Sequence, residues 1–207
     1  YLKQFIKATE IAAYGASLFT GKGDKNGADK SAVDLMRAEL NKIDMQGTIV
    51  IGEGEMDEAP MLYIGEKVGT KKGSSLDIAI DPVEGTNFVA QNLPNAFSVL
   101  AVAQKGSLLA APDTYMEKIA IGANLPNNLL DLDNSVEKNI KLLADAKNTS
   151  PDKLTACILE RPRHDKIVNS LKKMILKIKF ISDGDVAGAI FVVDKSSPVD
   201  IYLGTGG

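Results

Sequence analysis

The stretch Asp77-Ile-Ala-Ile-Asp81-Pro82-Val-Glu84-Gly85-Thr86 decides how this chain folds. Its residues alternate, so that acidic and small residues lie on one face of the expected strand and isoleucines on the other, which is typical of a buried strand. Pro82 cannot donate to a sheet ladder and holds the preceding residue extended, so we expect the strand to end at Asp81. Gly85 lets the backbone approach a ligand closely, and Thr86 is a good N-cap, so a helix is expected to begin there.

This stretch carries the chemistry of a phosphate site. Two carboxylates (Asp81 and Glu84) and the Thr86 hydroxyl lie within six residues, and the expected helix start adds backbone amides that have no intrahelical acceptor. Carboxylate oxygens suit a hard divalent cation bound beside a phosphoryl group. The sequence therefore predicts a metal and phosphate site at the end of this strand.

The composition is that of a soluble globular protein. The chain has 207 residues, of which 44% are hydrophobic, enough for one large domain or two small ones. A net charge of -3 gives no electrostatic case for nucleic acid. No apolar run approaches the roughly 20 residues of a membrane helix, and no secretory layout is present, so we expect no membrane partner and a cytoplasmic location. The single cysteine, Cys157, excludes an internal disulfide.

Two amphipathic helices are predicted at the start, over residues 2–19 and 30–43. Asp29 directly precedes the second helix. An acid there can cap free amides, an interaction worth about 0.5–2 kcal/mol, or it can bind a metal. The residues alone favour the cap.

A β-branched strand is predicted over residues 47–51, and it leads directly into acids that include Glu53 and Asp57. A solvated acidic turn is the usual outcome for such a cluster. Its position at the end of an apolar strand, which Asp81 shares, favours a metal site instead, because ligands collect at the carboxyl ends of sheet strands.

The order of elements predicts an α/β protein in two halves. In residues 1–125, strand-like runs over 96–103, 107–111 and 115–121 follow the helices, which indicates an α+β half with antiparallel strands. In residues 126–207, helices and strands alternate as βα units, which indicates a parallel sheet. This second half carries Arg161-Pro-Arg163 and Asp183-Gly-Asp185 after two of its strands.

Both segments of the second half have two interpretations. Guanidinium groups bind phosphate bidentately, but a surface basic turn is the likelier interpretation of Arg161 and Arg163 from the residues alone. Asp183 and Asp185 could accept hydrogen bonds from sugar hydroxyls or cap the next helix. His164 is the only histidine, so a His-rich zinc site is not available, and we expect it beside the site without a catalytic role.

The core stretch resembles the signature of the metal-dependent, lithium-sensitive sugar and inositol phosphatase superfamily. Further segments, in the same order along the chain, resemble those of class II fructose-1,6-bisphosphatases, and together they span essentially all 207 residues. These segments are Gly23–Asp29, Gly52–Pro60, Tyr115–Lys118, Arg161–Asp165 and Asp183–Asp185. Inositol monophosphatases share the core but lack the block at 52–57.

The resemblance implies a role for each matching residue. Metal ligands would be Asp29, Glu53, Asp81 and Glu84, and catalytic residues would be Thr86, Asp57 and Lys25. Substrate-binding residues would be Glu84, Gly85, Thr86, Tyr115, Arg161, Pro162, Arg163, Asp183, Gly184, Asp185 and Gly207.

The resemblance also implies a layered sugar-phosphatase fold with the active site where the halves meet. The expected activity is that of a phosphoric monoester hydrolase, using Mn²⁺ or Mg²⁺ to remove the 1-phosphate of fructose 1,6-bisphosphate in gluconeogenesis, and also acting on sedoheptulose 1,7-bisphosphate. Family members continue past residue 207 with a segment that holds another ligand glutamate, so incompleteness at the C-terminal end is expected. The alternatives are a catalytically incomplete fragment that binds sugar phosphate or metal, and an inositol-monophosphatase-like enzyme. Exposed apolar surface would favour a homo-oligomer.

Overall fold

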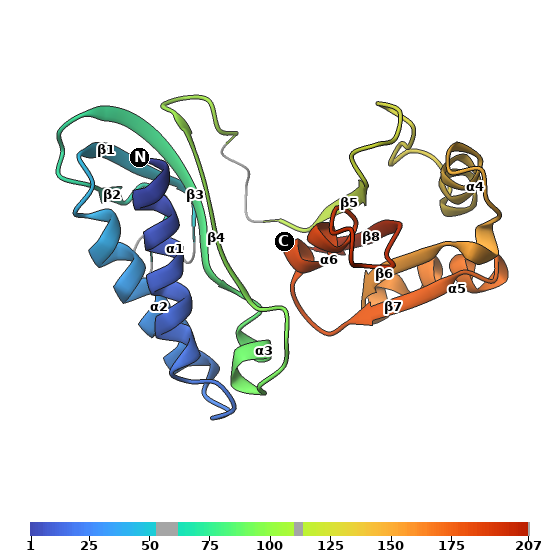
Figure 1. Ribbon diagram of the computed structural model, residues 1–207, viewed down its shortest axis with the longest axis horizontal. Helices are drawn as coiled ribbons and strands as arrows, with labels where there is room; N and C mark the ends of the chain where they lie inside the picture. Colours follow the sequence, from blue (N-terminus) through green and yellow to red (C-terminus); the bar gives the residue numbers. More distant parts are fainter. Residues whose placement is uncertain (53–61, 110–113, 207) are drawn as a thin grey trace. The chain divides into compact units, whose positions relative to one another are not determined.

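The computed structural model describes residues 1–52, 62–109 and 114–206. The chain divides into two compact units, Tyr1–Pro112 and Asp113–Gly207, and each contains helices packed on its own sheet (Figure 1). The α/β class expected from the sequence is confirmed. The two units are described one at a time.

The first unit is a layer of helices on a mixed sheet with strand order β2-β1-β3-β4. Strands β1 and β3 are parallel, and the other two pairs are antiparallel. Helices α1 and α2 lie side by side on one face of this sheet (Figure 1). The elements are α1 (Leu2–Ser17), α2 (Lys25–Leu40), β1 (Met45–Ile51), β2 (Lys67–Val68), β3 (Ser74–Glu84), α3 (Thr86–Ala90) and β4 (Phe97–Gln104).

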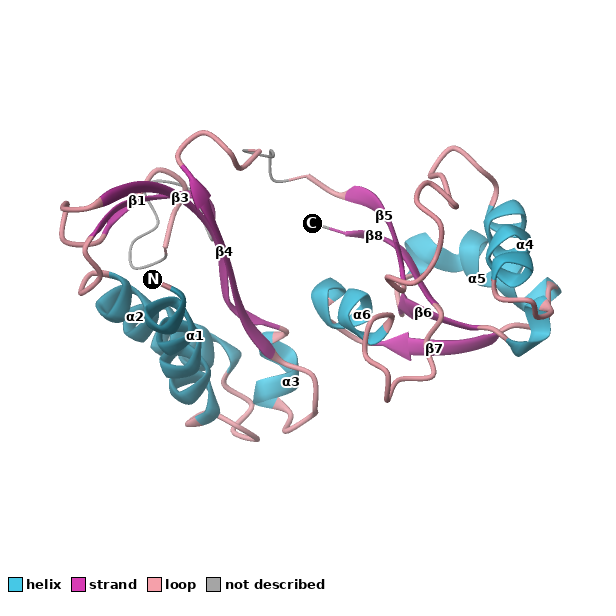
Figure 2. Cartoon of the chain, turned by 45° about the horizontal axis from the view of Figure 1, so that its top comes forward, coloured by secondary structure: helices cyan, strands magenta, loops and turns pink. Residues whose placement is uncertain are grey.

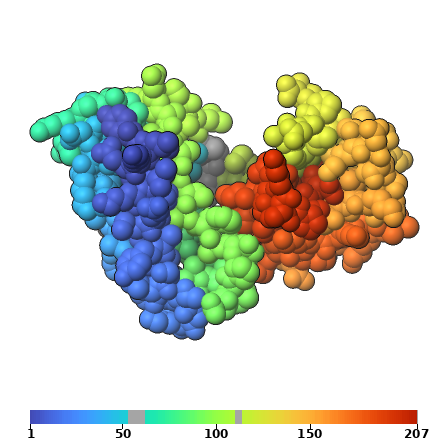
Figure 3. Space-filling view, viewed as in Figure 1, coloured from blue at the N-terminus to red at the C-terminus, as the bar shows by residue number. Residues whose placement is uncertain are grey.

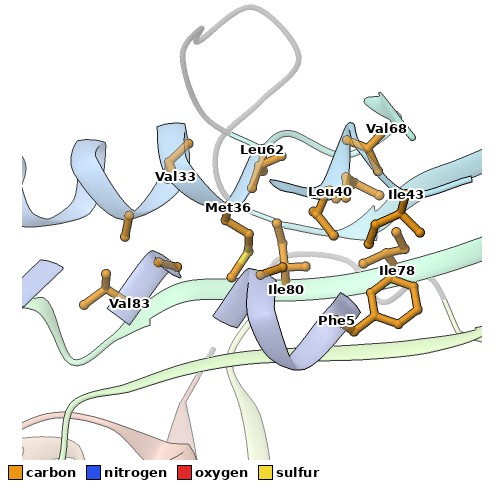
Figure 4. Close-up of a cluster of buried hydrophobic side chains, with 14 of the residues drawn as sticks. Phe5, Val33, Met36, Leu40, Ile43, Leu62, Val68, Ile78, Ile80 and Val83 are labelled. Carbon is orange, nitrogen blue, oxygen red and sulfur yellow. The ribbon is translucent and has the colours of Figure 1, made fainter. Parts of the chain in front are cut away.

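The core of the first unit follows from periodicity. Ile78 and Ile80 point from β3 toward the helices, and Val33, Met36 and Leu40 form the facing stripe of α2 (Figure 4). Alternation then directs Asp77, Ala79 and Asp81 to the other face of β3. The same period that builds the core therefore keeps the acids of β3 out of it.

Helix α2 begins earlier than the sequence predicted, and this corrects the capping interpretation of Asp29. The helix starts at Lys25, and its N-cap is Asp24, whose carboxylate accepts a hydrogen bond of 2.8 Å from the Gly27 N–H. Asp29 lies inside the helix, where no free amide needs a cap. The pattern failed here because polar residues fill the first turns of α2, so its apolar stripe begins after the helix does.

Strand β3 also differs from its prediction, because it continues through Pro82 to Glu84. The pairing with β4 is irregular between Asp81, which faces Val99, and Glu84, which faces Phe97. A bulge leaves residues outside the ladder, so the missing N–H of Pro82 costs no sheet hydrogen bond. After β4 the expected hairpin partner is absent from the described chain: residues 107–109 are not in a strand, and 110–111 lie outside the described ranges.

The second unit contains a sheet with strand order β5-β8-β6-β7. Strand β6 is parallel to both β7 and β8, as the βα pattern predicted, whereas β5 is antiparallel to β8. The strand over 116–121 was expected in the antiparallel first half and instead belongs to this second sheet. The elements are β5 (Met116–Ile121), α4 (Val136–Ala146), η1 (Pro151–Lys153), β6 (Thr155–Leu159), η2 (Pro162–His164), α5 (Asp165–Lys173), β7 (Lys177–Ile181), α6 (Asp185–Phe191) and β8 (Ile201–Gly206).

Helices cover both faces of the second sheet (Figure 2). Helices α4 and α5 pack on the face that carries Ala156, Ile201 and Leu203. Helix α6 packs on the other face, where Gly188 lies against the Tyr202 ring. Two covered faces explain why β6 is a continuous apolar run without alternation.

Helix α1 forms part of the surface of the first unit and is drawn in dark blue in the space-filling view (Figure 3). Helix α1 carries exposed apolar side chains such as Leu2 and Tyr14. Over the described residues, no helix combines the length and apolar character needed to cross a bilayer.

Candidate active site

The corner between β3 and α3 holds four of the predicted site residues: Asp81, Glu84, Gly85 and Thr86. Both acids are partly exposed, and one Asp81 oxygen accepts a 3.0 Å hydrogen bond from the Val83 N–H. Carboxylates held at a strand end with part of their surface open to solvent are accessible to a cation.

Gly85 makes this corner sharp. Its φ of 86° lies in the left-handed region, and a Cβ there would lie 2.6 Å from the Phe88 ring. A side chain at this position would be strained by both the backbone and the ring. Gly85 therefore takes the N-cap position predicted for Thr86, and Thr86 becomes the first residue of the short helix α3.

The loop between α1 and α2 is attached to α3 by backbone hydrogen bonds. The Gly21 N–H donates to the Val89 carbonyl at 3.0 Å, and the Gly23 N–H donates to the Ala90 carbonyl at 2.9 Å. Helix α2 begins two residues later, and it packs against both α3 and β3. The loop therefore holds the end of α2 that carries Lys25 and Asp29 against the helix that follows the acidic corner.

The end of β1 lies next to β3. Their parallel register pairs Ile51 with Ala79, two residues before Asp81. Neighbouring strands are about 4.8 Å apart, so the two carboxyl ends share one edge, as the sequence predicted. Glu53 and Asp57, which follow this strand, lie outside the described residues, as does Gly207.

The described part of the chain contains no group of three or more His, Cys, Asp or Glu side chains arranged to hold a metal ion. The donor set fits a hard cation in its chemistry, because Asp29, Asp81 and Glu84 offer only carboxylate oxygens. The metal assignment of these residues stays a prediction.

In the second unit, the segments 161–163 and 183–185 follow the carboxyl ends of β6 and β7, at one edge of the sheet. The Arg161 guanidinium donates from Nη1 to the Glu160 carbonyl at 2.9 Å and from Nη2 to the Ser182 carbonyl at 2.7 Å. These bonds join the loop after β6 to the loop after β7. Arg161 thus has a structural role in addition to any role toward a ligand.

Arg163 and Tyr115 meet at this edge, although they are 48 positions apart in the sequence. The Arg163 guanidinium carbon lies 4.7 Å from the centre of the Tyr115 ring, and its Nε donates to the Thr205 carbonyl at 2.8 Å. Tyr115 is 67% exposed. A guanidinium held by a ring and a carbonyl has a restricted orientation, and its Nη groups donate no hydrogen bond to the described chain, which suits binding of an anion.

His164 is fully buried and holds the end of β8 in place. Its Nδ1 lies 2.8 Å from the Leu159 carbonyl, and its Nε2 lies 2.9 Å from the Thr205 nitrogen. A carbonyl accepts and a backbone N–H donates, so the proton is on Nδ1 and Nε2 is an acceptor. The expectation of a non-catalytic histidine beside the site is consistent with this geometry.

Asp185 lies in a polar network that the sequence did not reveal. Its Oδ1 accepts from the Tyr202 hydroxyl at 2.6 Å, and its Oδ2 accepts from the Lys118 ammonium group at 2.5 Å. Asp185 does not cap α6, because Gly184 occupies the N-cap position without a side-chain hydrogen bond. The only sequence signal for Lys118 was its place in one of the segments that resemble the family. No sequence feature indicated that Tyr202 belongs to this network.

Known proteins resemble this chain over almost its whole length. Residues 1–207 match the family described as bacterial fructose-1,6-bisphosphatase, glpX-encoded. The chain is 46% identical over 204 residues to fructose-1,6-bisphosphatase 1 class 2 of Escherichia coli (strain K12), and 45% identical over 204 residues to fructose-1,6-bisphosphatase class 2 of Haemophilus influenzae (strain ATCC 51907 / DSM 11121 / KW20 / Rd). These matches cover 99% of this chain and 60% and 61% of the two relatives, so the chain spans about three fifths of their length.

Proposed function

Because the chain belongs to the family of bacterial glpX-encoded fructose-1,6-bisphosphatases, we propose that it is a phosphoric monoester hydrolase that removes the 1-phosphate of fructose 1,6-bisphosphate. The observation that carries this proposal is the corner between β3 and α3, which holds Asp81, Glu84 and Thr86 within six residues, beside the end of β1. Carboxylates and a hydroxyl at one sheet edge suit metal-assisted phosphate chemistry better than a nucleophilic mechanism based on the single, buried cysteine.

Asp81 and Glu84 would hold a divalent cation together with Asp29 and Glu53. Oxygen-only donors favour Mg²⁺ or Mn²⁺ over softer metals. When bound, the cation supplies positive charge where negative charge develops on the transferring phosphoryl group.

Thr86 is proposed to orient the attacking water through its hydroxyl, with Asp57 as the group that accepts a proton. The backbone supports this role for Thr86, because Gly85 turns the chain so that Thr86 opens α3 directly after the acids. The amides at the start of α3 would donate hydrogen bonds to phosphoryl oxygens. Lys25 would add a positive charge from the first turn of α2.

Arg163 and Tyr115 are proposed to hold the phosphate that is not hydrolysed, with Arg161 and Pro162 in the same loop. The ring contact and the bond to Thr205 support this role, because a guanidinium that is already ordered loses less entropy when it binds. Asp183, Gly184 and Asp185 would contact the sugar. Lys118 is then a positioning residue, because its ion pair holds one Asp185 oxygen.

Finer parts of the proposal rest on the family alone. Activity toward sedoheptulose 1,7-bisphosphate, a gluconeogenic role in the cytoplasm and a homo-oligomeric state are proposed on that basis. A division of function between the two compact units, Tyr1–Pro112 and Asp113–Gly207, is also proposed, with metal ligands in the first and sugar contacts mainly in the second.

The test is release of inorganic phosphate from fructose 1,6-bisphosphate with Mg²⁺, with Mn²⁺ or with EDTA. We expect metal-dependent release that Asp81→Asn abolishes, because one carboxylate oxygen becomes an amide and the net negative charge is lost. Asp34→Asn is the matched control: it removes an acid from the exposed side of α2, where Asp34 pairs with Lys30, and should retain activity.

Two results would count against the proposal. Release that persists in EDTA would exclude the metal mechanism, and equal losses in Asp81→Asn and Asp34→Asn would remove the assignment of Asp81. Thermal stabilisation by fructose 1,6-bisphosphate without release would instead support the alternative of a binding fragment without turnover.

A further inference from the structure

A hollow of about 260 Å³ lies on the first unit, against β1, β2 and β3. Polar side chains from four segments line it: Gln46, Thr48, Lys67, Lys71, Ser75 and Lys105. Three of these are lysines, and all three are exposed. We propose that this hollow is a second anion-binding site, distinct from the acidic corner, which takes a small phosphate-bearing ligand.

Alternation places the lining on the sheet face that lacks α1 and α2. Thr48 and Lys67 are partners in the antiparallel register, and the Lys67 ammonium group donates to the Thr48 hydroxyl at 2.7 Å. Gln46 and Ser75 are partners in the parallel register next to them. Partners in register point to the same face, so these four side chains form one surface.

Two turns bring the other lysines to this surface. Lys71 has a φ of 65°, a left-handed conformation that is uncommon for lysine, and its N–H donates to the Met45 carbonyl at 3.1 Å. The Lys105 N–H donates to the Ser75 carbonyl at 3.2 Å. A residue held in an unfavourable backbone region by the surrounding structure is a reason to look for function.

The three lysines of the hollow have no ion-pair partner within the described chain. Lys67, Lys71 and Lys105 form no ion pair with any described carboxylate, although the protein has more acids than bases. Two acids of neighbouring segments have other partners: Asp77 is buried and accepts from the Gly106 N–H at 2.6 Å, and Asp44 accepts from the Thr70 hydroxyl at 2.7 Å.

Size and chemistry limit the ligand. A hollow of this volume holds a small molecule, and ammonium groups with hydroxyl and amide donors match the oxygens of a phosphate. Ser75 precedes Asp81 by six residues on β3, which is about 20 Å along an extended strand. A ligand in the hollow is therefore too far away to be the phosphate that is hydrolysed at the corner.

The test is a titration of the ¹⁵N-labelled chain with inorganic phosphate, followed residue by residue by NMR in EDTA, with ionic strength held constant by NaCl. We expect saturable shifts of the amides of Thr48, Lys67, Lys71 and Gly106. Each single change of a lining lysine to Gln should raise the Kd roughly two- to fivefold, as for exposed charge contacts, and the triple variant should lose the saturable shifts.

Lys72→Gln is the matched control, because Lys72 is the exposed neighbour of Lys71 in the same turn and does not line the hollow. It changes the net charge equally and should leave the Kd unchanged. Shifts that stay linear to high phosphate, or a loss in Lys72→Gln equal to that in Lys71→Gln, would overturn the site. Because each amide reports its own location, phosphate bound near Thr86 or Arg163 would be seen separately, so this test does not depend on the proposed catalysis.

Discussion

Tyr202→Phe tests the polar network around Asp185. Tyr202 is 1% exposed, and its hydroxyl donates to the Asp185 carboxylate at 2.6 Å. Phenylalanine has the same shape without the hydroxyl, so no cavity forms and the ring still packs on Gly188. The loss is that of a hydrogen bond to a charged group, about 1.5–3 kcal/mol. The Asp185 side chain keeps its ion pair with Lys118 and is 12% exposed, so some hydration replaces the lost donor. We therefore expect the lower part of that range, about 1.5–2 kcal/mol.

The assay must report the second unit by itself, because two compact units can unfold in separate steps. Hydrogen exchange of the β8 amides, followed by mass spectrometry, meets this need. A loss of 1.5–2 kcal/mol corresponds to roughly 10- to 30-fold faster exchange for amides that exchange when the unit opens.

Tyr115→Phe is the matched control, because Tyr115 lies in the same unit and is 67% exposed, so its loss of a hydroxyl should change stability by less than about 0.5 kcal/mol. If β8 exchange in Tyr202→Phe equals that of the unsubstituted chain, the hydroxyl does not stabilise the unit and the reasoning about the network is refuted.

Three further predictions concern single positions. Gly188→Ala should destabilise the second unit by about 1–3 kcal/mol although alanine favours helix, because the added Cβ would lie 2.4 Å from the Tyr202 ring; faster β8 exchange checks this, and unchanged exchange would show that the ring can move. Hydrogen bonds from Lys42 and Lys7 hold the pKa of Glu39 below its ordinary value of 4.5. The ionised Glu39 therefore stabilises the fold fully above pH 4.5, and this stabilisation is lost as pH falls through the lowered pKa. Urea midpoints should accordingly fall less steeply with acid in Glu39→Gln than in the unsubstituted chain, and parallel slopes would contradict the assignment. Burial raises the pKa of Cys157 to about 11, so a disulfide reagent at pH 8 should label this thiol rapidly in urea and slowly in the native chain, and rapid native labelling would contradict its burial.

Local periodicity predicted most of the strands. The alternation in β3 and the apolar run in β6 depend on neighbours a few residues apart, and both strands lie where the sequence placed them. The ends of strands were predicted less reliably where a single residue disfavours a strand. Pro82 lacks the N–H that a sheet ladder needs, but the bulge opposite β4 means that no ladder hydrogen bond is lost there. A bulge depends on the partner strand, and the local pattern does not contain that strand.

Strand pairing was beyond the sequence argument. The run over 116–121 was recognised as a strand, but its partner β8 lies about 80 residues later and could not be chosen by pattern. Sequence order made a hairpin with the preceding strand the natural expectation. The actual pairing places Lys118 and Tyr115 in the unit that carries Asp185 and Arg163.

The same holds for the candidate site: the sequence predicted which residues belong to it but not which groups they contact. Strand ends and the family resemblance selected Arg161 and Arg163, but neither could indicate which of their N–H groups are in use. Arg163 donates from Nε to Thr205, so an anion cannot take the Nε and Nη2 pair and must be bound end-on by the two Nη groups. Arg161 uses one hydrogen of each Nη on backbone carbonyls and keeps one on each. Lysine at either position would keep the charge but could not donate to the protein and to a ligand in these fixed directions, so Arg→Lys changes here should impair binding of a phosphate more than the retained charge would suggest.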